Sequence, residues 1–153
     1  MTAVSTCLWL GERGEEAVNL YATLVPGSAI TAAHRLAPGA PAIMMHFHLS
    51  GAPYAALCAP GGPPPNHAAS IVVETADQAG TDALWQAHLD AGSTPVACGW
   101  ITDRFGVSWQ VFPRTMGALL FAGTPKANAR AFAAMQAQVK IDTAAIAAAA
   151  RGE

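Results

Sequence analysis

The chain has 153 residues, enough for one domain with a substantial core. Charged residues make up only 12% and the formal net charge is −2, so we expect no nucleic-acid partner. The chain lacks an apolar run of about 18 residues and a basic leader, so we expect neither a membrane span nor a secretory signal. The chain has three cysteines, an odd number, and none of them has CxxC spacing: Cys7, Cys58 and Cys98. This pattern indicates reduced thiols and a cytoplasmic location.

The first half of the chain predicts one strand, one helix and three further strands. Gly11 stops the first strand, and Glu15 and Glu16 place negative charge in the first turn of the helix. Ser50-Gly51 is typical of a hairpin turn. The predicted strands are 5–10, 28–36, 43–49 and 54–58, and the helix is about 13–25.

A segment rich in proline and glycine follows at 60–67 and predicts a linker. The same order of elements then repeats, with Asp77 able to cap the helix. The predicted strands are 69–75, 94–96, 98–102 and 107–112, and the helix is about 77–91.

The second half is organised around the hairpin 98–113. Trp109 alternates with Gln110, so the two side chains point to opposite faces of the last strand. The aromatic side chains Trp100 and Trp109 require a large apolar body to pack against. We therefore expect a sheet with one face under helices and the other face lining a cavity.

The tail 114–153 predicts helices. Thr124-Pro125 is a good helix start, Asp142 can cap a last helix, and Phe132, Met135 and Val139 form an apolar stripe. We expect the tail to lie against the domain or across a partner subunit.

The pattern of two βαβββ halves, together with the hairpin Gly99-Trp-Ile-Thr-Asp-Arg-Phe-Gly-Val-Ser-Trp-Gln-Val111, resembles the vicinal oxygen chelate superfamily. The closest branch is PhnB-like, also called 3-demethylubiquinone methyltransferase-like. The resemblance also runs through 7–11, 15–17 with Tyr21, 26–28, Asn66 and the tail around 135–145.

The resemblance implies an α+β fold in which paired βαβββ modules form an open eight-stranded barrel-like sheet around a cavity, followed by C-terminal helices. The whole chain would then be a single domain, usually found as a homodimer. Its parts are a first module at about 1–59, a linker at 60–67, a second module at 68–113 and a helical tail at 114–153.

Metal-dependent relatives place ligands at four positions that correspond here to Ser5, Ala56, Ser70 and Gln110. Only Gln110 could bind a metal, and an amide is a poor sole ligand for a transition metal. The chain also lacks a Gly-rich strand-to-helix loop suited to a nucleotide. We therefore expect neither the usual metal site nor a cofactor.

His46 and His48 lie on one face of their strand and could instead supply two ligands to a divalent metal. That reading gives a metal-dependent lyase or dioxygenase. The alternative is that both histidines are cavity-wall or dimer-contact residues.

Two classes of function follow from the sequence. One is a metal-free enzyme acting on an oxygenated small molecule, and the other is a protein that binds such a ligand without chemistry. No catalytic residue is assigned. We expect faces of both modules to converge on the ligand, and the predicted contacts are Trp9, His46, His48, Tyr54, Cys58, Ser70, Trp100 and Gln110.

Overall fold

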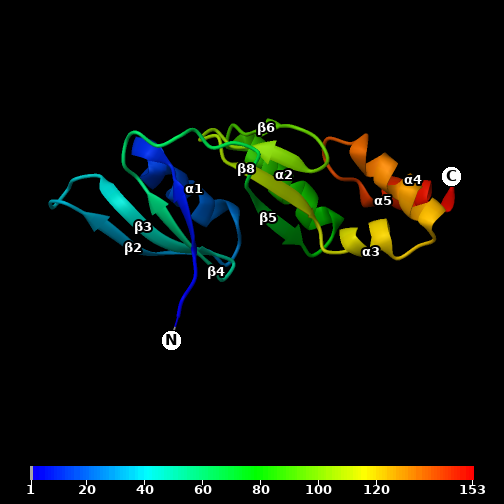
Figure 1. Cartoon of the computed structure of the whole chain (residues 1–153), viewed down its shortest axis with the longest axis horizontal. Helices are drawn as coiled ribbons and strands as arrows, with labels where there is room; N and C mark the ends of the chain where they lie inside the picture. Colours follow the sequence, from blue (N-terminus) through cyan, green and yellow to red (C-terminus); the bar gives the residue numbers. More distant parts are fainter. Residues whose placement is uncertain (1) are drawn as a thin grey trace. The chain divides into compact units, whose positions relative to one another are not determined.

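The structure, a computed structural model, describes residues 2–153 and divides the chain into two compact units that meet between Pro65 and Asn66. This boundary falls inside the predicted linker. Each unit contains one βαβββ module, and helices follow the second module (Figure 1). The mixed α+β class and the repeated order of elements are confirmed, and the eight strands form two four-stranded sheets.

The first module carries its sheet in the order β1-β4-β3-β2. β1 runs parallel to β4, and the other neighbours are antiparallel. The bounds agree with the predicted ones to within about two residues. The elements are β1 (Thr6–Trp9), η1 (Gly11–Arg13), α1 (Gly14–Leu24), β2 (Ala29–Arg35), β3 (Ala42–Leu49) and β4 (Ala52–Leu57).

A single helix, α1, packs on this sheet. Its buried side chains recur at helical spacing: Ala17, Val18 and Tyr21 are all fully buried. On β3, Met45 and Phe47 are each only 2% exposed, because they point to the face that α1 covers. The residues that alternate with them on β3, such as His46 and His48, therefore point to the opposite face. No helix of this module covers that face within the described residues.

Glu15, in the first turn of α1, joins the helix to the sheet. Its carboxylate accepts hydrogen bonds from the Arg35 guanidinium and from the backbone N–H of Ala42, at 3.0 Å. The bond from Arg35 is the main reason that the pKa of Glu15 lies below its usual value. This contact ties the ends of β2 and β3 to α1.

The second module carries its sheet in the order β5-β8-β7-β6, with α2 on one face. The Asp77 side chain caps α2 by accepting from the N–H of Gly80 at 2.8 Å, as the sequence predicted. The elements are β5 (Ser70–Thr75), α2 (Gln78–Asp90), β6 (Thr94–Pro95), β7 (Trp100–Thr102) and β8 (Ser108–Pro113).

Asp103 holds the hairpin between β7 and β8, a role that the sequence did not reveal. Its carboxylate is 4% exposed and accepts hydrogen bonds from the N–H groups of Phe105 and Val107, at 2.8 and 2.9 Å. Its other oxygen accepts from Trp109 Nε1 at 2.9 Å. A buried carboxylate needs such donors, so the turn and the core tryptophan are fixed together.

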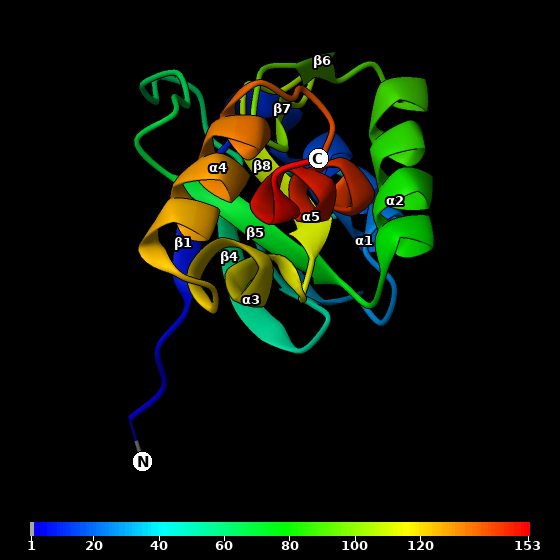
Figure 2. The same ribbon diagram turned by 90° about the vertical axis from the view of Figure 1, so that its right-hand side faces the viewer.

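The tail forms α3 (Met116–Phe121), α4 (Pro125–Gln136) and α5 (Thr143–Arg151), with α4 and α5 side by side (Figure 2). Thr124 and Asp142 cap α4 and α5 as predicted. The N–H groups of Cys98 and Gly99 donate to Gln138 and Val139, so the tail lies against the second module. The apolar centre of the tail contains Met116, Leu120, Ala131, Ile141 and Ile146.

Of the predicted apolar stripe in the tail, Met135 packs against the apolar centre, and the prediction is wrong for Phe132 and Val139. α4 ends at Gln136, before Val139, and Phe132 and Val139 are 42% and 49% exposed. The helix buries Ala131 instead, because alanine allows α4 to pack closely on α5. No helix within residues 2–153 is long and apolar enough to cross a membrane.

His88, on α2, is fully buried and lies 5.0 Å from the Trp109 ring. Burial lowers its pKa from 6.5 to about 4, partly offset by the negative charge of Asp103. The unfolded chain therefore takes up a proton at a higher pH than the native protein. We therefore expect this contribution to stability to be complete above about pH 6.5 and to fall by about 3 kcal/mol as the pH drops to about 4.

We expect the His88→Leu variant to lose this pH dependence, measured as the free energy of unfolding in urea between pH 7 and pH 4. Asn19→Ala supplies the control, since it changes an exposed side chain without a titratable group and should retain the wild-type slope. An unchanged slope in His88→Leu would contradict the assignment.

Candidate functional site

The uncovered face of the first sheet, called here the open face, follows from the pairing of β3 with β4. His46 pairs with Ala55 and His48 pairs with Pro53, whereas Phe47 pairs with Tyr54. Paired residues of an antiparallel sheet point to the same side. The two histidines therefore lie on the open face, and Phe47 and Tyr54 lie on the face toward α1.

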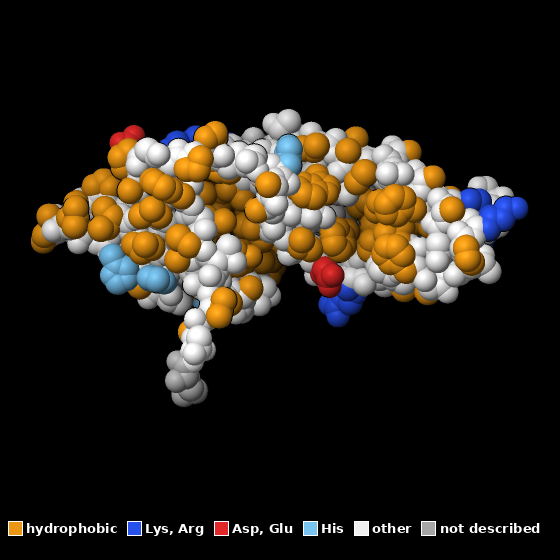
Figure 3. All heavy atoms as spheres, in the orientation of Figure 1, with side chains coloured by type: hydrophobic (Ala, Val, Ile, Leu, Met, Phe, Trp, Pro, Cys, Tyr) orange, Lys and Arg blue, Asp and Glu red, His pale blue; other side chains and the backbone are white. Residues whose placement is uncertain are grey.

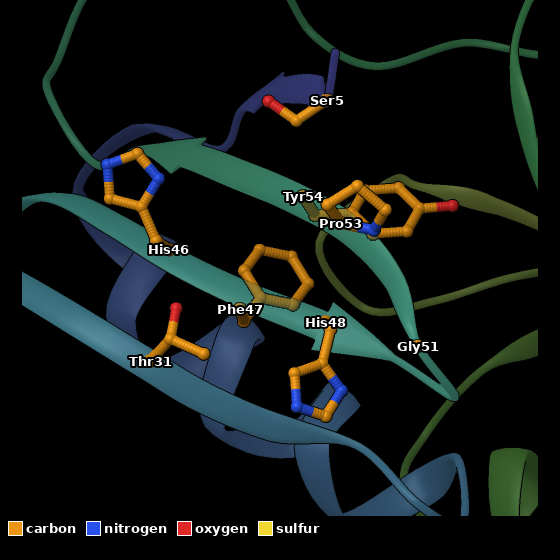
Figure 4. A pocket seen from close by; sticks show the side chains of 8 residues that line it. All are labelled: Ser5, Thr31, His46, Phe47, His48, Gly51, Pro53 and Tyr54. Carbon is orange, nitrogen blue, oxygen red and sulfur yellow. The ribbon is translucent and has the colours of Figure 1, made fainter. Parts of the chain in front are cut away.

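A pocket of about 380 Å³ lies at this face, within the range of small-molecule sites (Figure 4). Polar side chains reach it from the start of the chain, from β2 and from β3. Nδ1 of His48 is buried and has no hydrogen-bond partner among the described residues. The lining residues are Ser5, Thr31, His46, Phe47, His48, Gly51, Pro53 and Tyr54.

Trp9 also lies on the open face. It pairs with Leu57, which in turn pairs with Met44 on the same side of β3 as His46. Its indole Nε1 donates to the carbonyl of Ala59 at 2.7 Å. Gly62 packs directly on the ring, where an added Cβ would lie 2.7 Å from the indole. The Pro-Gly segment therefore needs glycine there in order to cover Trp9, which is still 41% exposed.

The second sheet has an open face of its own, opposite α2. Gln110 pairs with Val72 on one side and Trp100 on the other, and its Nε2 donates to Ser70 Oγ at 2.7 Å. One cross-strand row on this face carries only hydroxyl side chains. Its members are Ser70, Ser108, Thr102 and Thr94.

His67 joins this second face, although the sequence did not place it. Its Nδ1 lies 2.8 Å from Ser108 Oγ, and its ring meets Trp100 edge-on at 6.0 Å. The only sequence signal was its position at the end of the predicted linker, shortly before β5. Ser108 is 1% exposed, so its hydroxyl has a structural role as a hydrogen-bonding group and is not accessible as a nucleophile.

Residues 2–112 match the family model described as 3-demethylubiquinone-9 3-methyltransferase. The chain belongs to this family. The match ends within β8, so the tail lies outside it. The segment 135–145, which the resemblance drawn from the sequence included, is therefore not part of the match. No curated protein matches the chain.

Solved structures share the fold of this family member. A putative 3-demethylubiquinone-9 3-methyltransferase, PhnB protein, from Bacillus cereus has a TM-score of 0.62 at 22% identity over 72% of this chain and 99% of its own. A gene product from Arabidopsis thaliana has a TM-score of 0.55 at 19% identity, over 74% and 99%. A glyoxalase-related enzyme from Fulvimarina pelagi has a TM-score of 0.53 at 13% identity, over 73% and 88%. With the family match, these likenesses confirm the PhnB-like branch of the vicinal oxygen chelate superfamily.

The face assigned to β4 from the resemblance is wrong in this family member. Ala56 and Cys58 point toward α1, because Ala56 pairs with the buried Met45. A Cβ added at Gly14 would lie 2.5 Å from Cys58 Sγ, so the thiol packs against α1. Tyr54 stacks on Phe47 at 5.4 Å and is also among the residues that line the pocket.

Burial raises the pKa of the Cys58 thiol and of the Tyr54 phenol, so both favour their neutral forms. Neither side chain shares the face of His46 and His48. The other predicted contacts, Ser70, Trp100 and Gln110, share the open face of the second sheet.

The four positions expected for metal ligands do not fit a metal. Ala56 has no ligand atom and faces α1, and Ser70 is bonded to Gln110. Within residues 2–153, no group of three His, Cys, Asp or Glu residues could hold a metal ion.

The helix starts do not fit a nucleotide phosphate either. α1 has Glu15 and Glu16 in its first turn, and Asp77 occupies the cap of α2. Negative side chains at these positions repel the phosphate that a helix start would otherwise attract. The name of the family therefore does not by itself assign methyl transfer to this chain.

Adjacent residues of β8 test the two faces of the second sheet. Trp109→Ala should lower the free energy of unfolding by about 3–5 kcal/mol, because it leaves a cavity in the core and removes one of the hydrogen bonds to Asp103. Gln110→Ala removes one hydrogen bond on the open face and should cost about 1 kcal/mol or less. Equal costs in urea denaturation would contradict this assignment.

Proposed function

We propose that this chain binds an uncharged or weakly polar, oxygen-bearing small molecule in the pocket on the open face of its first module. The observation that carries the proposal is the pocket itself, whose lining includes hydroxyls, imidazoles and the ring of Pro53. A few polar groups in an apolar hollow are typical of ligand sites. Ser5, Thr31 and His48 would fix the ligand by hydrogen bonds.

The lining favours a ligand without a full negative charge. Among its eight residues there is no lysine or arginine to pair with a phosphate or carboxylate. The imidazoles and hydroxyls of the lining can form hydrogen bonds with the hydroxyl or carbonyl oxygens of such a ligand.

The second module supports the same class of ligand. Ser70 and Gln110 offer neutral hydrogen-bonding groups beside Trp100. A binding protein and a metal-free enzyme are both consistent with these residues. The glyoxalase-related enzyme from Fulvimarina pelagi shares the fold, which favours testing for turnover as well as binding.

The metal-dependent alternative rests on His46 and His48, which do share a face. It predicts a divalent metal held by both histidines. Metal analysis of the untagged protein tests this alternative. One equivalent of a divalent metal in the wild-type protein, lost in the His48→Asn variant, would favour the metal-dependent enzyme.

The proposal includes a cytoplasmic homodimer. The exposed thiol of Cys7 suits a reducing compartment. Ile30, Trp9 and Val72 are large apolar side chains that are 37%, 41% and 49% exposed on the sheets, and a second copy could cover them. Sedimentation at the mass of one chain at micromolar concentration would contradict the dimer.

Binding should be measured by calorimetry with a panel of uncharged hydroxy ketones, diketones and phenols. His48→Leu should weaken binding about three- to tenfold, the effect of losing one neutral hydrogen bond. Asn19→Ala, on the exposed side of α1, is the control and should bind normally. Unchanged affinity in His48→Leu, or tighter binding of benzoate and phosphate than of neutral compounds, would contradict the proposal.

A further inference from the structure

The histidine nearest to His46 is His34, on the neighbouring strand. Their ring centroids lie 5.4 Å apart and the rings meet edge-on at 89°. Both residues are exposed, and histidine side chains gather on the surface of the first module (Figure 3). By comparison, two residues along one strand separate His46 from His48 by about 6.6 Å of backbone.

Met44 completes this cluster. It pairs directly with His34 and precedes His46 by two residues, so all three side chains share the open face. Directly opposite residues have Cβ atoms about 4.5–5.5 Å apart. Met44 is half-buried, and its flexible thioether side chain leaves β3 next to both histidines.

We propose that His34, Met44 and His46 form a binding site for a soft transition metal ion, with Cu(I) the preferred occupant. Thioethers select Cu(I), and imidazoles suit copper as well. None of the three ligands is a carboxylate, the ligand that magnesium and calcium prefer.

This site is distinct from the positions that the family resemblance assigns to metal ligands, and it does not depend on the pocket function. It combines β2 with β3, whereas the expected positions were Ser5, Ala56, Ser70 and Gln110. A thioether also explains how a metal site could exist where no three His, Cys, Asp or Glu residues cluster within residues 2–153.

Cys7 is the competitor that the experiment must remove. It lies on the same open face, but Ala55 pairs with both Cys7 and His46 and separates them. Two strand spacings amount to about 9.6 Å, too far for a shared ion. Its exposed thiol would nevertheless bind Cu(I) by itself.

The test is an anaerobic titration of the untagged Cys7→Ser protein with Cu(I), in competition with a coloured Cu(I) chelator. We expect one equivalent to bind. His34→Asn and His46→Asn should each lower the affinity about tenfold or more, because each removes one ligand. Met44→Leu keeps the apolar volume, so it should lower the affinity for Cu(I) and leave that for Zn(II) unchanged.

His67→Asn is the control, since it changes an exposed histidine of the second module, outside the cluster. Its affinity for Cu(I) should equal that of the Cys7→Ser parent. The thermal midpoint of each variant shows whether it folds, and the exposed His34 on an edge strand is the safest position to change.

Three results would overturn the proposal: no Cu(I) binding by the Cys7→Ser protein, equal losses in His67→Asn and His34→Asn, or no effect of Met44→Leu. His48→Leu tests the small-molecule proposal and His34→Asn tests the copper site. The two proposals can therefore fail separately.

Discussion

Each four-stranded sheet in this chain packs a module helix on one face only, and this one-sided cover determines what the strands present on the other face. Under α1, the side chains of Met45 and Phe47 are buried, and His46 and His48, which alternate with them, are left on the open face. Under α2, Trp109 and Val111 are buried, and Gln110 is left on the open face. A strand has a side-chain period of two, so burying one set fixes the position of the other.

The polar contacts that hold the two modules differ. In the first, Glu15 ties α1 to the ends of β2 and β3 through Arg35 and the N–H of Ala42. In the second, Asp103 joins a turn to the buried indole of Trp109. Each carboxylate is supplied with donors, so each fixes the ends of neighbouring strands without an unpaired charge.

The order of elements was predictable because glycine, proline and alternating side chains mark where strands and helices end. The face of β4 was also predictable but was missed. Ser50 and Gly51 both have positive φ angles, of 48° and 90°, as a two-residue type I′ turn requires. Such a turn pairs Leu49 with Ala52, and therefore His46 with Ala55. The error came from transferring a ligand position from the family instead of counting outward from the turn.

Other features depend on contacts that no local pattern reveals. The proximity of His34 to His46 follows from register shifts in β2, between Ile30 and Ala32 and between His34 and Arg35. The contact of His67 with Ser108 joins residues 41 positions apart in the sequence. Asp103 resembled an ordinary turn residue, and only the fold shows that its carboxylate is buried beside Trp109.

The adjacent methionines of β3 provide the most direct test of the open face. Met44 is half-buried on that face, and Met45 is 2% exposed beneath α1. With ¹³C-labelled methionine methyl groups, a soluble nitroxide should broaden the Met44 NMR signal strongly and leave that of Met45 nearly unchanged. Stronger broadening of Met45, or equal broadening of both signals, would contradict the assignment of the faces and with it the proposed site.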